Sequence, residues 1–263
     1  MAGAAIAMFA AASAARAQRG DSVAVPDDPH AVQPERPTVA THAGTVAPGW
    51  VEIEAGLELD HLHGAHVFLT PTVLKLGVVP RVQLELAGSF QHLSGSTPDY
   101  SGIGDLTAAL KWRVLEHAPV IGDVSVQPSL KLPTGSAAHG TGTGTTDVGL
   151  LLISSHDWGP YALDLNAGYL RRSGDGSVAP KNAGIWTVSA GGPVYRALGW
   201  VVELFGYPRT TGPAGEDGIV AFLTGPTFEL HRWLVVDGGV IFPLTGSQPH
   251  ALYAGLTWNL GHL

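Results

Sequence analysis

The sequence predicts an all-β protein: a transmembrane antiparallel up-and-down β-barrel of about 12 strands, preceded by a signal peptide and a disordered tail. Three observations lead to this prediction. Segments in which apolar and polar residues alternate recur from residue 50 to the C-terminus. Charged residues make up only 14% of the chain, against roughly 25% in ordinary soluble domains. Long and short connections also alternate, which is typical of barrels in the outer membrane.

The composition excludes several other classes of protein. The net charge is −8 and no basic stripe is present, so a nucleic-acid partner is not expected. Cysteine is absent, which excludes a disulfide framework and a thiolate site. After the first twenty residues, no apolar run approaches the ~18 residues of a membrane helix, which excludes a helical membrane protein.

The N-terminus reads MAGAAIAMFAAASAARAQ, an Ala-rich apolar stretch that ends in the cleavage pattern Ala15-Arg16-Ala17. This pattern indicates a signal peptide over residues 1–17; the alternative is a buried or frayed Ala-rich helix. Residues 18–47 contain four prolines among polar residues and show no periodicity, which favours a flexible periplasmic tail. The barrel is then expected over residues 48–263.

Alternation is clear in the first predicted strand, WVEIEAGLEL (50–59), where the residues at odd positions from Val51 are apolar. Glu52, Glu54 and Glu58 occupy even positions, and a period of two places the two sets on opposite faces of a strand. Most predicted strands are close to the ~9–11 residues of a tilted transmembrane strand. The twelve segments are 50–59, 66–76, 81–92, 104–114, 123–132, 147–155, 161–170, 184–191, 200–207, 219–230, 234–242 and 251–260.

Three prolines fall in the middle of predicted strands. Pro71, Pro128 and Pro226 each remove a hydrogen-bond donor from the sheet. Each proline therefore predicts either a β-bulge or a strand whose bounds differ from those given above.

Alternation alone does not tell which face looks inward, but the connections help. The odd-numbered connections include the long, polar and Gly-rich ones, whereas the even-numbered ones include GVVPR, HDWGP and HRW. Long loops on one side and short turns on the other indicate an outer-membrane barrel with its turns in the periplasm. The long connections are 93–103, 133–146, 171–183, 208–218 and 243–250.

The tryptophans give a second indication. If both termini are periplasmic, six of the seven lie at or beside the periplasmic strand ends, and only Trp186 lies at the other end. Indole rings favour the headgroup region of a membrane, whereas core tryptophans would be scattered along the strands. The six are Trp50, Trp112, Trp158, Trp200, Trp233 and Trp258.

The polar faces of the strands are therefore expected to line the lumen. Turns near residues 118 and 98 would place Asp105 opposite Lys131, and Glu85 opposite Lys111; a slip of two residues would re-pair them. Arg113 would similarly lie opposite Asp123, so a ladder of opposite charges is predicted. The predicted lumen residues are Glu52, Glu54, Glu58, Glu85, Asp105, Lys111, Arg113, Asp123, Lys131, Asp164, Asn166, Glu203 and Glu229.

Two neighbouring stretches carry a family resemblance. SGIGDLTAALKWRV (101–114) and SVQPSLKLPTGS (125–136) resemble an outer-membrane family described as "putative MetA-pathway of phenol degradation". The G-I-G-D opening of one strand and the K-x-P-T-G closing of the next carry the likeness, and APGWVEIEAG (47–56) is similar too. The resemblance covers about residues 45–263. It implies a transporter-like barrel linked to the uptake of hydrophobic or aromatic compounds, with no established catalytic residues.

The C-terminal strand resembles an assembly signal. Gly255, Trp258 and Leu260 look like the terminal signal that the barrel-assembly machinery reads, although three residues follow Leu260 where an aromatic residue usually ends the chain. The alternative is an ordinary last strand. The expected partners are thus outer-membrane lipid, the barrel-assembly machinery and a small solute.

Other candidate sites are weaker. GTGTGTT (140–146) lacks the G-K-[ST] ending of a phosphate loop. His61, His63 and His66 cluster in the first external loop, but no cysteine or carboxylate completes a metal site. His92 and Ser94, two residues apart on the lipid side, resemble the His and Ser of outer-membrane lipid hydrolases, but no third group is identifiable.

Three functions follow from these observations. The favoured one is a channel or transporter for small molecules, hydrophobic or aromatic ones among them, in the outer membrane of a Gram-negative bacterium. This function needs no catalytic residue, metal or cofactor. The alternatives are a lipid hydrolase that uses His92 and Ser94, and a structural or adhesive barrel.

Overall fold

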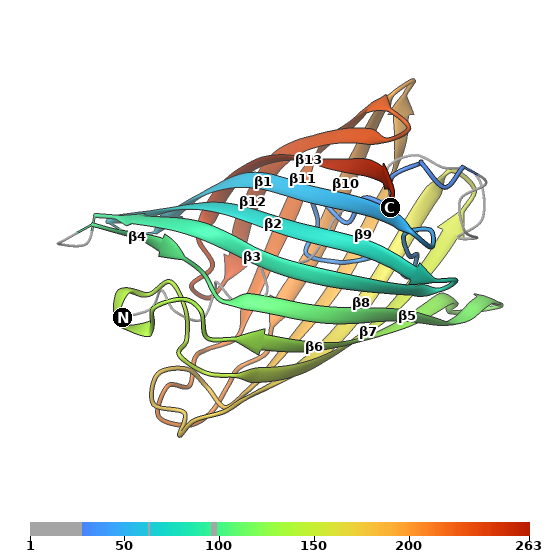
Figure 1. The fold of residues 1–263 in the computed structure, drawn as a ribbon. Coiled ribbons are helices and arrows are strands. Elements are labelled where there is room, and N and C mark those ends of the chain that lie inside the picture. The colour runs from blue at the N-terminus through green and yellow to red at the C-terminus, as the bar shows by residue number, and fades with distance from the viewer. Residues whose placement is uncertain (1–27, 63, 96–98) are drawn as a thin grey trace.

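The computed structural model describes residues 28–62, 64–95 and 99–263. Twelve long strands form a closed antiparallel barrel (Figure 1), which confirms the predicted fold class. Within the described part of the chain, no helix is long and apolar enough to cross a membrane. The barrel strands are β1 (Trp50–Leu62), β2 (Ala65–Val79), β3 (Val82–Ser94), β5 (Leu106–Ala118), β6 (Gly122–Leu132), β7 (Asp147–Trp158), β8 (Tyr161–Arg172), β9 (Asn182–Tyr195), β10 (Leu198–Tyr207), β11 (Ile219–His231), β12 (Leu234–Thr245) and β13 (His250–His262).

The barrel closes where its first and last strands meet. β1 pairs with β13, with Glu54 opposite Thr257, and the other barrel strands pair with their neighbours in the chain. Closure leaves the barrel without an open sheet edge. The short strand β4 (Tyr100–Ile103), which the sequence did not predict, pairs with the outer end of β3, and a 3-10 turn, η2 (Ala137–His139), lies in the loop after β6.

The acidic face of the first strand looks inward. Glu52 and Glu54 are 0% and 2% exposed, whereas Leu57 on the opposite face is 54% exposed. The same division holds around the barrel, since leucines such as Leu84 and Leu150 are exposed on the outside. Apolar side chains outside and polar side chains inside are what a strand between lipid and a lumen requires.

The three mid-strand prolines do not end their strands. Pro71, Pro128 and Pro226 remain paired with β3, β7 and β10, respectively. Toward the other neighbouring strand, pairing is interrupted at each proline, in the β1–β2, β5–β6 and β11–β12 pairs. A missing N–H therefore interrupts pairing with one neighbour only, because the other neighbour does not use that donor.

The connections are sorted between the two ends of the barrel as predicted. Two-residue turns at 80–81, 159–160, 196–197 and 232–233 lie at the end that holds the C-terminus, whereas the loops 133–146, 173–181 and 208–218 lie at the opposite end (Figure 1). Trp158, at one of these turns, is 80% exposed. Following the orientation expected from the sequence, we call the end with the short turns periplasmic and the opposite end external.

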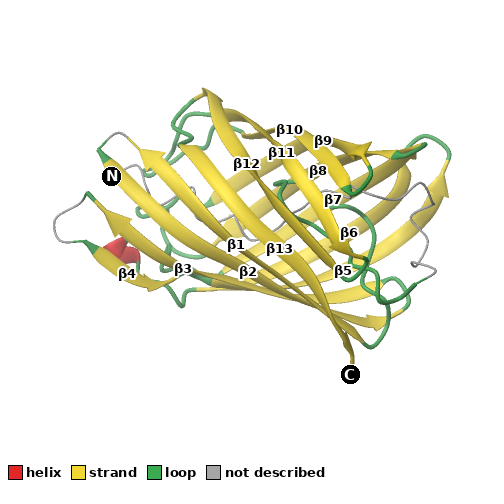
Figure 2. Ribbon diagram, turned by 90° about the horizontal axis from the view of Figure 1, so that it is seen from above, coloured by secondary structure: helices red, strands yellow, loops and turns green. Residues whose placement is uncertain are grey.

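The segment before β1 differs from the expected loose tail. Residues 30–47, which we call the plug, lie inside the ring of strands, because their backbone is hydrogen-bonded to inward-facing side chains of β1, β7, β8 and β10. Loop segments are seen within the space that the strands enclose (Figure 2). Ala31, Ala40, Thr41, His42 and Ala43 are each at most 1% exposed. The plug lacks an apolar face of its own, but the lumen offers polar partners for its backbone. The remaining residues of the expected tail, 18–27, and the expected signal peptide lie outside the described residues.

Candidate functional site

The plug begins at an aromatic cluster on the periplasmic rim. The ring of His30 lies 5.1 Å from that of Trp50 and 6.2 Å from that of Trp233, centroid to centroid. The Val32 amide then donates to the carbonyl of Arg232 in the β11–β12 turn, at 2.8 Å. These contacts fix the point at which the chain passes from the rim into the lumen.

The first turn of the plug binds the acidic face of β1. The Gln33 amide donates to Glu52 (2.9 Å) and the Glu35 amide donates to Glu54 (2.6 Å). Lys75 of β2 lies between these carboxylates, 3.1 Å from Glu52 and 2.8 Å from Glu54, and donates to the Gln33 carbonyl at 2.5 Å. The predicted lumen residues Glu52 and Glu54 are thus occupied by the protein's own backbone.

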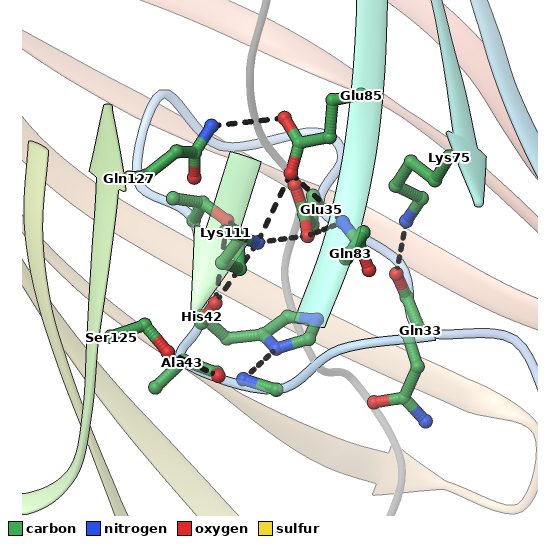
Figure 3. Close-up of polar contacts among 12 residues, drawn as sticks. Gln33, Glu35, His42, Ala43, Lys75, Gln83, Glu85, Lys111, Ser125 and Gln127 are labelled. Atoms are coloured by element: carbon green, nitrogen blue, oxygen red, sulfur yellow. Dashed lines mark hydrogen bonds and ion pairs between the residues drawn. The ribbon is translucent and has the colours of Figure 1, made fainter. Parts of the chain in front are cut away.

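A second buried lysine binds side chains of the plug (Figure 3). Lys111 of β5 pairs with Glu35 and also donates to the Thr41 hydroxyl (2.8 Å) and the His42 carbonyl (3.2 Å). Burial alone would raise the pKa of Glu35, but Lys111 and the more distant Lys75 outweigh it and hold that pKa well below its usual value. Glu35 is therefore an ionised anchor.

Glu85 completes this cluster on the β3 side. Its carboxylate lies 3.7 Å from the Lys111 ammonium and accepts hydrogen bonds from Gln83 (2.8 Å) and Gln127 (2.9 Å). Two amide donors and one shared cation compensate a carboxylate that is only 6% exposed. Such compensation is what a buried charge requires.

The tip of the plug is held by Glu203 of β10 and Asn166 of β8. Both oxygens of Glu203 accept backbone hydrogen bonds, from Val39 and Ala40, at 2.7 Å each. Asn166 binds Thr41 twice, accepting from its amide (2.7 Å) and donating to its carbonyl (2.9 Å). Val39 also packs on an inward-facing apolar cluster, which consists of Val201, Phe205, Ala221, Leu223, Ile241, Ala251 and Tyr253.

The returning half of the plug binds serines and a glutamine. The Ala43 amide donates to Ser155 and its carbonyl accepts from Ser125, both at 2.7 Å. The Val46 amide donates to Gln83, also at 2.7 Å. These wall residues lie on the same inward rows as the predicted lumen residues, but being uncharged they were not singled out from the sequence.

Arg36 is a second side-chain anchor that the sequence analysis missed. Its guanidinium makes two 3.2 Å hydrogen bonds to the Asp237 carboxylate of β12. Gly56 and Gly255 lie opposite each other on β1 and β13, and a Cβ on either would collide with this guanidinium. Gly255, predicted as part of an assembly signal, thus also leaves room for the plug.

The predicted ion pairs form, but in a different register. Asp105 lies 2.7 Å from Lys131, although the residue directly opposite Lys131 is Thr107. Both predicted hairpin registers are shifted by two residues, since Lys111 lies opposite Gln83 rather than Glu85. The predicted Arg113–Asp123 pair is likewise present, at 3.5 Å. A two-residue shift keeps every side chain on its face, and these long side chains bridge the diagonal.

Asp105 also anchors the external loop 133–146. Its carboxylate accepts from the backbone amides of Gly135 and Thr143, both at 3.0 Å. Lys131 reaches Asp147 as well, at 2.9 Å. The family-like G-I-G-D and K-x-P-T-G stretches therefore fold this loop against the barrel, with Asp105 and Lys131 as the charged centre.

The remaining predicted lumen residues also lie on inward rows. Asp164 accepts from the Ser155 hydroxyl at 2.5 Å, and Asp123 accepts from the His117 amide at 2.8 Å. Glu58 and Glu229 are half-buried near opposite ends of the barrel.

Beside the plug lies a cavity of about 80 Å³. Small residues on five strands create it, and Leu151 and Leu170 add an apolar wall while Glu85, Gln127 and Lys131 add polar groups. Since one water needs roughly 10–15 Å³, the cavity has room for about six. The small residues are Ala87, Thr107, Ala109, Ser129, Gly149 and Gly168.

The weaker candidate sites do not assemble. The His92 ring lies 2.7 Å from the Ser101 hydroxyl, whereas the Ser94 hydroxyl lies 3.5 Å from the His66 carbonyl, so His92 and Ser94 are not paired. In the described ranges no group of three potential metal ligands comes together. Within the predicted histidine cluster, His61 and His66 stack edge to face, and His63 lies outside the described residues.

Comparisons with known proteins agree with this architecture. The fold is similar to an outer membrane channel from Pseudomonas putida F1, with a TM-score of 0.64 and 15% identity over 82% of this chain and 97% of that one. It is also similar to the NanC porin, with a TM-score of 0.54 and 10% identity over 80% of this chain and all of that one. No curated protein matches the chain.

The sequence itself matches one family over most of its length. Residues 35–260 match the family described as "Putative MetA-pathway of phenol degradation", so the match includes most of the plug and all the barrel strands except the last residues of β13. The chain is an outer-membrane β-barrel of a Gram-negative bacterium and belongs to this family.

Proposed function

We propose that this protein is an outer-membrane channel for small molecules, with hydrophobic or aromatic compounds among its solutes, and that it acts by passage rather than catalysis. The observation that carries the proposal is the cavity beside the plug. It has one apolar wall and several polar groups, which suits a small solute with an apolar body and a polar substituent. The family description, which names phenol degradation, and the two similar channels support the same reading.

The arrangement also explains how such a channel stays closed to most solutes. The plug lies across the lumen and is held mainly by hydrogen bonds to polar side chains. Each bond to a neutral side chain contributes a net stabilisation of only about 0.5–1.5 kcal/mol, and each bond to a charged side chain about 1.5–3 kcal/mol. We therefore infer that the plug can shift locally while the strands stay in place.

Liposome swelling tests this proposal. Refolded protein should admit aromatic acids faster than sugars or amino acids of similar size. Ala109→Leu, which fills the cavity, should slow the aromatic acids several-fold. Thr227→Val, a buried change on β11 that does not line the cavity, serves as the control. Equal rates for wild type and Ala109→Leu, with both proteins showing the heat-modifiable gel migration of a folded barrel, would remove the cavity from the path.

A further inference from the structure

The lumen wall binds the plug chiefly through the plug's backbone. Seven backbone amides of the plug donate to wall side chains: those of Gln33, Glu35, Val39, Ala40, Thr41, Ala43 and Val46. Four backbone carbonyls accept from wall side chains: those of Gln33, Thr41, His42 and Ala43. Every residue except proline offers the same two groups, so these contacts do not depend on the plug's sequence.

The wall makes far fewer contacts with the side chains of the plug. Glu35 pairs with Lys111 and accepts from Gln83, Arg36 pairs with Asp237, and the Thr41 hydroxyl accepts from Lys111. Apart from His42, residues 38–47 are Ala, Gly, Thr or Val. The wall therefore suits an extended chain with small side chains that carries one acidic and one basic residue near its N-terminal end.

We propose that the polar wall of the lumen is a peptide-binding site, which the plug occupies as an intramolecular ligand and which also takes extended oligopeptides from solution. This inference goes beyond the proposed passage of small molecules. A tethered occupant acts at an effective concentration in the millimolar range. A free peptide must compete with the plug, so it binds the native protein weakly and binds better when the plug's own anchors are removed.

A full-length variant with a weakened plug tests the competition. Glu35→Gln combined with Arg36→Ala removes both ionic anchors of the plug and leaves every wall residue unchanged. A fluorescein-labelled peptide with the sequence of residues 30–46 is titrated against wild type and variant in micelles, and fluorescence anisotropy reports binding. We expect binding to the variant to be at least about tenfold tighter. Arg36→Ala alone replaces the double variant if the latter does not show the heat-modifiable migration of a folded barrel.

Chemical variants of the peptide test whether its backbone is what binds. Esters in place of the amides of Val39 and Ala40 remove the two donors to Glu203 with little change of shape, and should weaken binding by about tenfold or more. An ester at Thr45 is the matched control, since the Thr45 amide donates to no described group. A peptide that keeps Glu35, Arg36 and Thr41 but permutes the other residues of 38–46 should bind within about threefold of the original, because single neutral contacts are small.

Three results would overturn the proposal. Peptide binding could be absent from both proteins. The ester peptide could bind as tightly as the amide peptide, which would show that the backbone donors are not recognised. The permuted peptide could lose binding, which would make the plug a sequence-specific lock rather than one occupant of a general peptide site.

Discussion

At the scale of single residues, two buried lysines organise the interior of the barrel. Lys75 and Lys111 are both fully buried, and each lies between carboxylates of the wall and groups of the plug. A buried charge without a partner is costly, so each lysine holds its surroundings in one arrangement. Some of the lumen residues predicted from the sequence therefore contact the protein's own plug, and some line the cavity.

Replacing Lys111 by methionine tests this role. The change leaves Glu35 and Glu85 buried without their shared cation, so we expect a loss of about 3–5 kcal/mol in the free energy of unfolding. Urea titration followed by heat-modifiable gel migration measures it. Lys181→Met, at an exposed loop position, should stay within about 0.5 kcal/mol of wild type. Equal stability of the two variants would mean that Lys111 is not a buried anchor.

At the scale of strands and loops, charged residues at strand ends fold the external loop after β6. Asp105 binds both Lys131 and the backbone of loop 133–146, so one carboxylate joins the start of β5 to the end of β6. The two family-like stretches lie on these strands. Their charged residues thus have a structural role, whether or not a solute also touches them.

A double-mutant cycle measures the coupling across this hairpin. Asp105→Ala and Lys131→Ala should each destabilise the barrel, and the double variant should cost less than their sum, by about 0.5–3 kcal/mol. The exposed Arg209–Asp217 pair, at 3.7 Å, is the control and should show almost no coupling. Strictly additive losses for Asp105 and Lys131 would show that the pair does not form in the membrane.

The last strand is also expected to matter for assembly. Trp258 and Leu260 of β13 are exposed on the outside of the barrel, where they can contact lipid or an assembly factor. Changing both to serine should lower the yield in the outer membrane several-fold and increase degradation in the periplasm. Immunoblots of membrane fractions report this result; an unchanged yield would leave β13 as an ordinary strand.

Strands could be predicted from the sequence much better than the plug. Alternation located most of the barrel strands because lipid outside and polar groups inside impose a period of two. The period of two does not determine the register between neighbouring strands, because a shift of two residues keeps every side chain on the same face. The plug was missed because its contacts are made by backbone amides, such as those of Val39 and Ala40, which leave no pattern in the side chains.

At the scale of the whole molecule, the N-terminal segment occupies part of the interior of the barrel. The plug enters at the periplasmic rim, reaches Glu203 and Asn166, and returns to the start of β1, so it contacts strands around most of the wall. The channel, the cavity and the peptide site all depend on this arrangement. All three require residues 30–47 to lie inside the lumen.

Disulfide cross-linking tests this placement of the plug, because the native chain has no cysteine. In the native protein the Ala43 amide nitrogen lies 2.7 Å from the Ser155 hydroxyl oxygen, so these two residues are neighbours. The test variant combines Ala43→Cys with Ser155→Cys. Oxidation of this folded variant should produce a fast-migrating cross-linked band, whereas Ala43→Cys with Thr227→Cys, on β11, should not. No cross-link in the first variant, or equal cross-linking in both, would contradict the account and return residues 30–47 to a loose periplasmic tail.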